Sequence, residues 1–426
     1  MRYAAIVDRL ANEGARAWEV HGRAMQHRRE GRDVVILSIG DPDFETPEAI
    51  TKAMVERVSS GDTHYGSIDG GPELKAAIAA YHKRQTSHDV GAENISVTLG
   101  AQGGLYGAAM CVAQYGDEII VPQPVYVTYD SVVQACGATL VDVPLRPERD
   151  FHLDAGDIEA AVTPRTRAVM INTPHNPTGA AYGRDDLMAL GEVCKRHDLW
   201  LISDEVYSRT LFDGREHVSP ASLPGMAERT IVVDSLSKSH AMTGWRVGWT
   251  VGPAAFTRHM YYLGLALHYG PPTFIQSSVA VAFTENFPEV EEMRARYEAR
   301  RNLVCEALAA CERVRVIKPE GSCFMMIDVR PSGLTSQEFS SRLLDEAGVS
   351  LLPGEGFGSN GSGFVRLSLT ASDEELSEAS RRIARFAGTL NLPARSITAL
   401  RRAPDTFQDH VKDASSPCIR RDLRSR

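Results

Sequence analysis

Residues 235 to 249 read Ser235-Leu236-Ser237-Lys238-Ser239-His240-Ala241-Met242-Thr243-Gly244-Trp245-Arg246-Val247-Gly248-Trp249, and they follow a run typical of a buried strand. Most lysines are solvated surface charges, yet Lys238 lies among hydroxyl residues, with Arg246 and several glycines after it. A lysine becomes a nucleophile when its amine is partly desolvated or lies near positive charge. Ser235 and Ser237 can donate hydrogen bonds to a phosphate, and an arginine can bind the same phosphate through two parallel donors. A lysine beside a phosphate grip indicates pyridoxal phosphate (PLP), bound as a Schiff base.

From Ser235 through Gly248 this stretch resembles, without a gap, the lysine signature of the class I and II aminotransferases. The resemblance extends over roughly residues 1 to 390. It implies the type I PLP-dependent fold, an α/β architecture with a mainly parallel sheet in a large domain and a smaller α/β domain. The expected parts are an N-terminal arm with part of the small domain (1–45), the large PLP-binding domain (46–290), the small C-terminal domain (291–390) and a poorly ordered tail (391–426).

Composition narrows the class of protein. The chain has 426 residues, 24% charged and 43% hydrophobic, which is typical of a soluble globular protein with more than one domain. A net charge of −9 argues against nucleic acid as a partner. No apolar run reaches the length of a membrane span. The seven cysteines are scattered and include no Cys-x-x-Cys pair, so we expect reduced thiols, a cytoplasmic location and no metal site.

Short hydrophobic runs alternate with helical segments through the first two thirds of the chain. These runs are typical of strands, and they lie at 95–99, 119–122, 139–143, 168–171, 199–203 and 231–234. Alternation of this kind indicates an α/β layer with a mainly parallel sheet. Ligands of open α/β sheets bind at the carboxyl ends of the strands, so the residues that follow each run are candidates for the site.

Two of these strand ends carry chemistry that can be argued from residue type. Gly100-Ala101-Gln102 follows the first run and opens a helix, where free backbone N–H groups and the helix dipole favour a phosphate. Asp204 ends a hydrophobic run, and a buried acid is costly unless it is paired. A carboxylate that faces the pyridine nitrogen keeps it protonated and makes the ring an electron sink. Glu205 is the rival acid, but Asp204 matches the aspartate of the family.

Other roles come from the resemblance alone. It implies that Lys238, Asp204 and Tyr207 are catalytic, that Asn176 and Tyr207 contact the phenolic oxygen of the cofactor, and that Tyr126 stacks on its ring. It also implies that Tyr65 reaches the cofactor phosphate across the interface of a homodimer with shared active sites. Plainer readings are a turn for Asn176, core packing for Tyr126 and a surface position for Tyr65.

The substrates would be a small-molecule amino acid and a 2-oxo acid. Arg366 is an arginine among apolar residues of a predicted strand, and a buried arginine needs an anion. The resemblance makes it the clamp on the substrate α-carboxylate, assisted by Asn176 and the backbone of Gly40, whereas an internal salt bridge is the plainer reading. Within the family, the amino-acid sequence of several stretches is similar to that of enzymes that move the α-amino group of L-arginine to pyruvate.

A guanidinium substrate calls for an acidic partner, and the acids on glycine-rich segments are Asp41, Asp43, Asp69 and Glu355. Each is also an ordinary loop charge, and Glu355 or Asp69 is the hypothesis for arginine selection. The alternatives are an aspartate-type or aromatic aminotransferase of broad specificity, and a PLP-dependent carbon–sulfur lyase. A PLP-sensing regulator would need a DNA-binding module, for which the roughly 30 residues before the first predicted strand leave no room.

Overall fold

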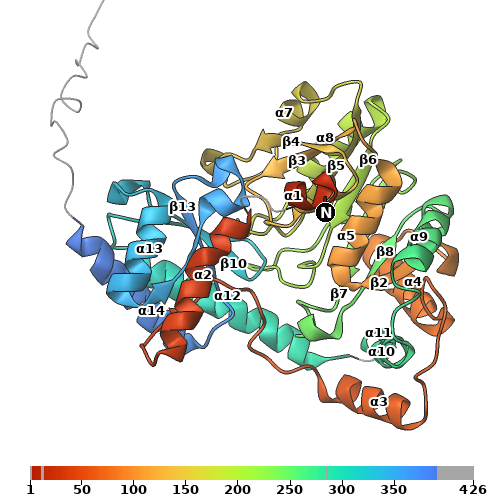
Figure 1. The fold of residues 1–426 in the computed structure, drawn as a ribbon, viewed down its shortest axis with the longest axis horizontal. Helices are drawn as coiled ribbons and strands as arrows, with labels where there is room; N and C mark the ends of the chain where they lie inside the picture. The colour runs from red at the N-terminus through yellow and green to blue at the C-terminus, as the bar shows by residue number, and fades with distance from the viewer. Residues whose placement is uncertain (1, 11–13, 285, 391–426) are drawn as a thin grey trace, which may run out of the picture. The chain divides into compact units, whose positions relative to one another are not determined.

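A computed structural model describes residues 2–10, 14–284 and 286–390. The prediction of a poorly ordered tail over 391–426 concerns residues outside this described part. Within it, seven strands form one large sheet and four shorter strands form a second sheet. Helices surround both sheets (Figure 1).

The large sheet has the strand order β2-β8-β7-β6-β5-β3-β4. Four of its neighbouring pairs are parallel, and β8 is antiparallel to both of its neighbours. This confirms the predicted mainly parallel sheet. Its strands are β2 (Ile95–Leu99), β3 (Glu118–Gln123), β4 (Thr139–Pro144), β5 (Thr166–Asn172), β6 (Trp200–Asp204), β7 (Thr230–Ser235) and β8 (Val247–Val251).

Successive side chains of a strand point to opposite faces of the sheet. Because successive residues of these strands are apolar, both faces of the sheet are apolar and are covered by helices. Val169 and Leu201 pack in one cluster with Leu190 of α8, whereas Met170 and Ile202 pack in another with helices on the opposite face. The helices of this part are α3 (Glu48–Ser59), α4 (Pro72–Thr86), α5 (Gly100–Val112), α6 (Tyr129–Ala135), α7 (Ala155–Ala160), α8 (Arg184–Arg196), α9 (Ala254–Leu267), α10 (Thr273–Val279) and α11 (Val281–Thr284). Continuous burial explains why the central strands read as unbroken hydrophobic runs.

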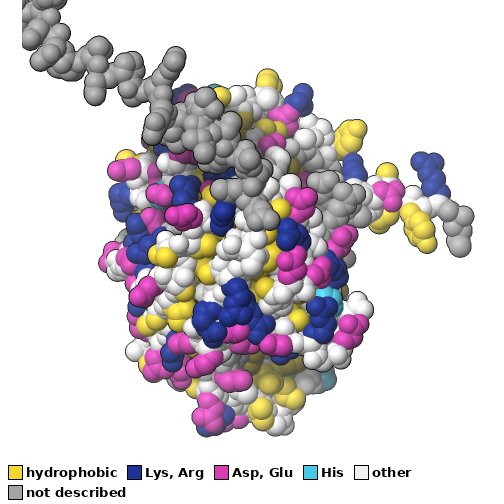
Figure 2. Space-filling view, turned by 90° about the vertical axis from the view of Figure 1, so that its left-hand side faces the viewer, with side chains coloured by type: hydrophobic (Ala, Val, Ile, Leu, Met, Phe, Trp, Pro, Cys, Tyr) yellow, Lys and Arg dark blue, Asp and Glu magenta, His cyan; other side chains and the backbone are white. Residues whose placement is uncertain are grey.

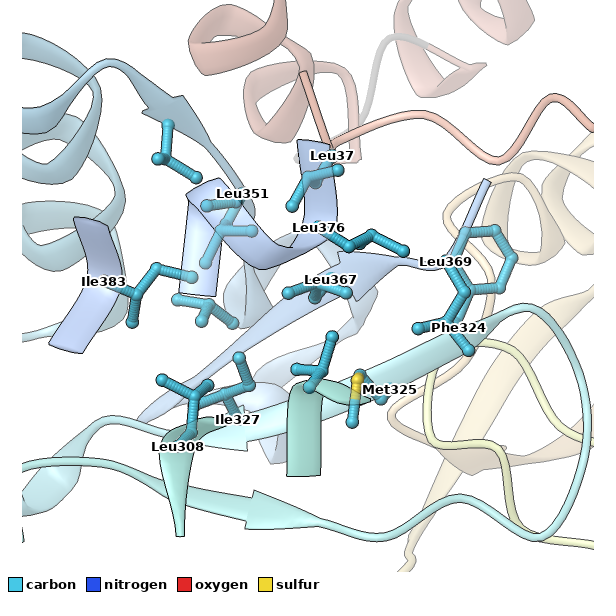
Figure 3. Close-up of a cluster of buried hydrophobic side chains, with 14 of the residues drawn as sticks. Leu37, Leu308, Phe324, Met325, Ile327, Leu351, Leu367, Leu369, Leu376 and Ile383 are labelled. Atoms are coloured by element: carbon cyan, nitrogen blue, oxygen red, sulfur yellow. The ribbon is translucent and has the colours of Figure 1, made fainter. Parts of the chain in front are cut away.

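The second sheet is antiparallel, with the order β12-β13-β10-β9. Its strands are β9 (Arg315–Ile317), β10 (Phe324–Asp328), β12 (Leu352–Pro353) and β13 (Phe364–Ser368), and its helices are α12 (Pro288–Leu308), α13 (Ser336–Ala347) and α14 (Asp373–Thr389). Thr335 and Ser372 form capping boxes that fix the starts of α13 and α14. Leucine, isoleucine and methionine side chains fill the space between strands and helices (Figure 3).

The N-terminal segment contacts both parts of the chain. It contains α1 (Ala5–Leu10), which packs against α6 beside the large sheet, α2 (Gly14–Arg29), and β1 (Val35–Ile36), which is shorter than the strand that the run at 34–39 predicts. β1 pairs in parallel with β11 (Val349–Ser350), and Val20 and Ala24 of α2 pack against Leu344 of α13.

Acidic and basic side chains intermingle on the face shown in Figure 2, without one large patch of either sign. No helix in the described part of the chain combines the length and the apolar character that crossing a membrane requires.

Candidate active site

A cavity of about 280 Å³ lies at the carboxyl ends of β5, β6 and β7. The sequence-predicted residues that line it are Gly40, Ala101, Gln102, Tyr126, Asn176, Asp204, Tyr207, Ser235, Ser237, Lys238, Arg246 and Arg366. Of the predicted site residues, Gly100 and Tyr65 do not line it. Residues more than 300 positions apart in the sequence thus share one cavity, because β10 and β13 face the carboxyl edge of the large sheet.

One corner of the cavity gathers hydrogen-bond donors. The first turn of α5 places the free N–H groups of Ala101 and Gln102 here, next to the hydroxyls of Ser235 and Ser237. Gly100 has φ +72°, and a Cβ there would lie 2.3 Å from Nη2 of Arg246. The glycine therefore allows the guanidinium of Arg246 to approach the start of the helix. Arg246 itself donates to two backbone carbonyls, Thr243 at 2.7 Å and Leu99 at 3.4 Å.

Lys238 follows the end of β7, and its Nζ donates to the carbonyl oxygen of Gly40 at 2.5 Å. Desolvation lowers the pKa of this amine, and the positive charges of Arg366 and Arg246 lower it further. A lowered pKa increases the fraction of neutral amine, which is the nucleophilic and proton-accepting form.

The two adjacent acids at the end of β6 have different surroundings. Asp204 lines the cavity, where its Oδ2 accepts a hydrogen bond of 2.6 Å from the hydroxyl of Tyr129 and burial raises its pKa to about 6. Glu205 instead accepts from Ser203, Ser219 and His217 at 2.9, 2.8 and 2.7 Å. Its carboxylate is therefore occupied by neighbours in the fold, and it does not line the cavity.

Arg366 extends from β13 into the cavity and is 1% exposed. It donates to Oδ1 of Asn176 at 3.0 Å and to the carbonyl of Ser38 at 2.9 Å, and its Nε is buried without a partner. Its guanidinium lies 4.0 and 4.7 Å from the ring centroids of Phe324 and Phe357. Among the described residues no carboxylate pairs with it, so the internal salt bridge considered for this arginine is absent.

Asn176 connects the two sheets. Its side chain accepts from Arg366, and its amide nitrogen lies 3.5 Å from the hydroxyl of Tyr207. Asn172, the last residue of β5, accepts from the backbone N–H of Asn176 at 2.7 Å and fixes the turn. The residues predicted around the cofactor's phenolic oxygen therefore meet in one place.

The sequence matches the family described as aminotransferase class I and II over residues 32–383. The chain belongs to the class I and II aminotransferases. It is accordingly an enzyme that depends on PLP.

Relatives of this aminotransferase agree in length as well as in sequence. It is 50% identical to the arginine–pyruvate transaminase of Pseudomonas aeruginosa over 390 residues, which cover 92% of this chain and 99% of the relative. It is 38% identical to an aspartate aminotransferase of Pyrococcus abyssi, covering 83% of this chain and 91% of the relative.

Solved structures of aminotransferases share the fold. The aspartate aminotransferase of Rhizobium meliloti matches with a TM-score of 0.87 at 34% identity, covering 92% of this chain and 100% of that one. The Thermus thermophilus aspartate aminotransferase with maleate matches with a TM-score of 0.85 at 35% identity, covering 90% and 100%. These matches establish the type I PLP-dependent fold.

The cavity of this aminotransferase fits its cofactor on chemical grounds. The α5 N-terminus, the two serine hydroxyls and Arg246 form a donor set for a dianionic phosphate, and Gly100 keeps that corner free of a side chain. A lysine amine with a lowered pKa and a buried carboxylate lie in the same cavity. These groups supply what a phosphorylated pyridine aldehyde requires.

Sequence reasoning missed several lining residues of the aminotransferase, namely Trp18, Ile39, Leu105, Asn172, Val206, Thr243 and Phe324. Trp18 lies on α2, within the segment at 1–45 predicted as an N-terminal arm with part of the small domain. Thr243 lies within the lysine stretch itself, so its position could have been found from the motif. Tyr65 is 86% exposed and lies outside this cavity.

The acids considered for substrate selection do not line the cavity. Asp43 pairs with Arg300 at 2.7 Å, and Asp69 pairs with Lys75 at 2.6 Å. Asp41 accepts from Thr243 at 2.6 Å, and Oε1 of Glu355 lies 3.3 Å from the hydroxyl of Ser362. Asp69 is therefore committed to a structural ion pair.

Proposed function

We propose that this aminotransferase moves the α-amino group of L-arginine to pyruvate and so produces 5-guanidino-2-oxopentanoate and alanine in arginine catabolism. The observation that carries the proposal is 50% identity, over almost the full length of both chains, to the arginine–pyruvate transaminase of P. aeruginosa. Relatives described as aspartate or aromatic aminotransferases are 38% identical or less.

The proposed phosphate site consists of the backbone N–H groups of Gly100, Ala101 and Gln102, the hydroxyls of Ser235 and Ser237, and Arg246. Tyr65 completes it from the partner subunit. Tyr126 stacks on the ring of the cofactor, and Asn176 and Tyr207 contact its phenolic oxygen. Asp204 holds a proton at the pyridine nitrogen, which its position in the cavity and the Tyr129 hydrogen bond, which favours the ionised carboxylate, support.

When bound, PLP supplies a covalent attachment for the amino group and a conjugated ring that takes up the electrons of a broken Cα–H bond. Lys238 binds the cofactor and, once its amine is free, moves protons. Its Nζ removes the proton from Cα of arginine in the first half-reaction and returns one to Cα of alanine in the second. The lowered pKa of this amine supports the role of proton acceptor.

Arg366 binds the α-carboxylate of both substrates through two parallel donors. The support is a buried guanidinium without a carboxylate partner in the described part of the chain. Gly40 contributes backbone to the same carboxylate site, since its carbonyl contacts Lys238 and Ile39 lines the cavity. Asn176 orients the guanidinium from the large sheet.

We further propose a cytoplasmic homodimer with shared active sites. Exposed aromatic and aliphatic side chains support an interface beside Tyr65, because Tyr65 packs edge to face on Tyr269 at 5.1 Å and α9 carries further exposed apolar residues, namely Tyr261, Tyr262, Leu265 and Leu267. The proposed boundaries remain 1–45 and 291–390 for the smaller domain and 46–290 for the PLP-binding domain.

The experiment that tests the reaction is an absorption spectrum of the purified holoenzyme with L-arginine and no 2-oxo acid. Loss of the visible cofactor band, with recovery after pyruvate, is the expected result and covers both half-reactions. A band that ignores arginine and responds to aspartate or an aromatic amino acid would reassign the substrate. Release of ammonia and pyruvate without any 2-oxo acid would indicate a lyase instead.

A further inference from the structure

The indole of Trp18 forms a part of the cavity wall that has no role in the proposed chemistry. Trp18 lies on α2, is half-buried and lines the cavity together with Lys238 and Arg366. It packs against an apolar cluster that includes Tyr126 and Phe357. It therefore closes the cavity on the side of the N-terminal segment.

The charges in the cavity leave a cationic side chain without an acidic partner. Among the described residues that line it, the charged ones are Asp204, Lys238, Arg246 and Arg366. The single carboxylate, Asp204, accepts from Tyr129 and is assigned to the pyridine nitrogen. The other three are basic residues, so the described lining residues leave no free carboxylate for a guanidinium.

Aromatic faces are the remaining groups that can attract a cation. The described lining residues include Trp18, Tyr126, Tyr207 and Phe324. The ring of Phe324 is already covered by the Arg366 guanidinium at 4.0 Å. Tyr207 is 4% exposed, and Tyr126 is assigned to the cofactor ring. Trp18 is the aromatic residue of this set that remains available.

Trp18 is fixed to the same scaffold as the carboxylate clamp. The ring of His21 packs edge-on against it at 5.6 Å, and Nδ1 of His21 hydrogen-bonds the hydroxyl of Ser38 at 2.9 Å. The carbonyl of Ser38 in turn accepts from Arg366 at 2.9 Å. The indole and the clamp are thus held in a set relation, which lowers the entropy cost of binding a ligand that spans both.

We propose that Trp18 selects substrates with a cationic side chain by presenting its indole face to their guanidinium group. Tryptophan gives the strongest cation–π attraction of the aromatic residues, and a guanidinium is planar and weakly hydrated, so it stacks at little desolvation cost. Pyruvate has no such group and does not use Trp18. This inference rests on the proposed function and deepens it by naming a specificity determinant.

The test is calorimetric titration of the holoenzyme with 5-guanidinopentanoate, which lacks an α-amino group and cannot react. Hexanoate is the control, because it has the same carboxylate but no cationic group at the other end. Trp18→Ala should weaken 5-guanidinopentanoate binding about tenfold and hexanoate binding less than about threefold. Trp18→Phe should retain part of the preference. Met25→Ala, on the exposed face of the same helix, is the matched control and should change neither affinity.

Steady-state kinetics give a second readout. In Trp18→Ala, kcat/KM for arginine should fall about tenfold. The KM for pyruvate should stay within about twofold, because pyruvate binds the Arg366 clamp but has no guanidinium group that contacts Trp18. Equal weakening of both titrated ligands would overturn the proposal, since it would reduce Trp18 to an apolar wall. Loss of the guanidinium preference in Asp41→Asn but not in Trp18→Ala would also overturn it.

The outcomes separate this inference from the proposed function. Wild-type enzyme that does not convert arginine yet binds 5-guanidinopentanoate more tightly than hexanoate, in a Trp18-dependent manner, would refute the reaction and support the cation site. Wild-type enzyme that converts arginine but shows no preference between the two acids would support the reaction and refute the cation site.

Discussion

In the described part of the chain, two arginines have an exposed fraction of 1% or less, Arg301 on α12 at 0% and Arg366 on β13 at 1%. Arg301 forms two parallel hydrogen bonds with Asp213, at 2.7 and 2.8 Å, and donates to the carbonyl of Pro319. Its charge is compensated within the chain. This arginine holds α12 against the segment that precedes β10.

Arg366 has neutral neighbours instead. Its partners are an amide oxygen, a backbone carbonyl and two phenylalanine rings, and burial lowers its pKa to about 10. A buried charge without a partner destabilises a fold. The comparison teaches how a compensated and an uncompensated buried arginine differ, and it supports the proposal that Arg366 binds a ligand.

The largest effect on activity is expected for Arg366→Met, which keeps much of the length of the side chain and removes its charge. This variant tests whether the two arginines differ in function. We expect kcat/KM to fall about 10³-fold for both arginine and pyruvate, because each loses a buried, charge-assisted carboxylate contact. Urea denaturation should show an unchanged or higher free energy of unfolding. A variant that unfolds far more easily than wild type would show that Arg366 is structural.

The same substitution at Arg301 should act on stability instead. Arg301→Met removes the partner of Asp213, and we expect the free energy of unfolding to fall by about 3 kcal/mol, the low end for a broken buried pair because Asp213 is half-exposed. Turnover per folded molecule should stay near that of wild type. If activity fell while stability did not, the distinction between the two arginines would be wrong.

A smaller effect on stability is expected from His152, a cation that has acidic partners, as Arg301 has, but that loses its charge at high pH. His152 lies between Asp186 at 2.8 Å and Glu320 at 2.9 Å, and the hydrogen bond to Glu320 contributes most to raising its pKa to about 9. Because the folded pKa is raised, the stabilisation is complete below about pH 6.5 and is lost as the pH rises through about 9. It amounts to at most about 2 kcal/mol in this partly exposed cluster.

Melting temperatures of wild type and His152→Gln between pH 6 and pH 10 provide the measurement. The difference in melting temperature between the two proteins should be largest at pH 6 and should nearly vanish at pH 10. Taking the difference removes the contribution of the lysines, tyrosines and cysteines that both proteins share. A difference that is constant over this range would mean that the histidine is not charged in the folded protein.

Much of the fold could be predicted from the sequence because local patterns and the final environment agree. Continuous hydrophobic runs correspond to strands buried on both faces. The strand expected at 34–39 shrinks to β1, because its partner β11 offers two residues and lies more than 300 positions away in the chain. Pairing at such a distance leaves no local signal.

The site divides in the same way. Lys238 and Arg246 lie in one continuous stretch of sequence, and Gly100 opens a helix directly after a strand, so local sequence motifs predict their positions in the site. Arg366 lies among apolar neighbours in the sequence and Arg301 lies between Arg300 and Asn302, so in neither case does the local sequence identify the partners that the tertiary structure shows. The resemblance singled out Arg366, whereas residue patterns alone left an internal salt bridge open. Residue type also could not show that Asp69, one of the acids considered for substrate selection, pairs with Lys75, which lies six positions along the chain.

The pairing of β1 with β11 also has a consequence for how the protein is made. The strands of the large sheet are all synthesised once Val251 has left the ribosome, but Val35 needs Val349 as its partner. Roughly a hundred further residues separate these two events, which at about 5 to 20 residues per second takes roughly 5 to 20 s. During that interval the segment that carries Trp18 and Gly40 has no strand to pair with. The strand at Val35–Ile36 is therefore among the last of the described elements to reach its native position, although it is synthesised before the large sheet.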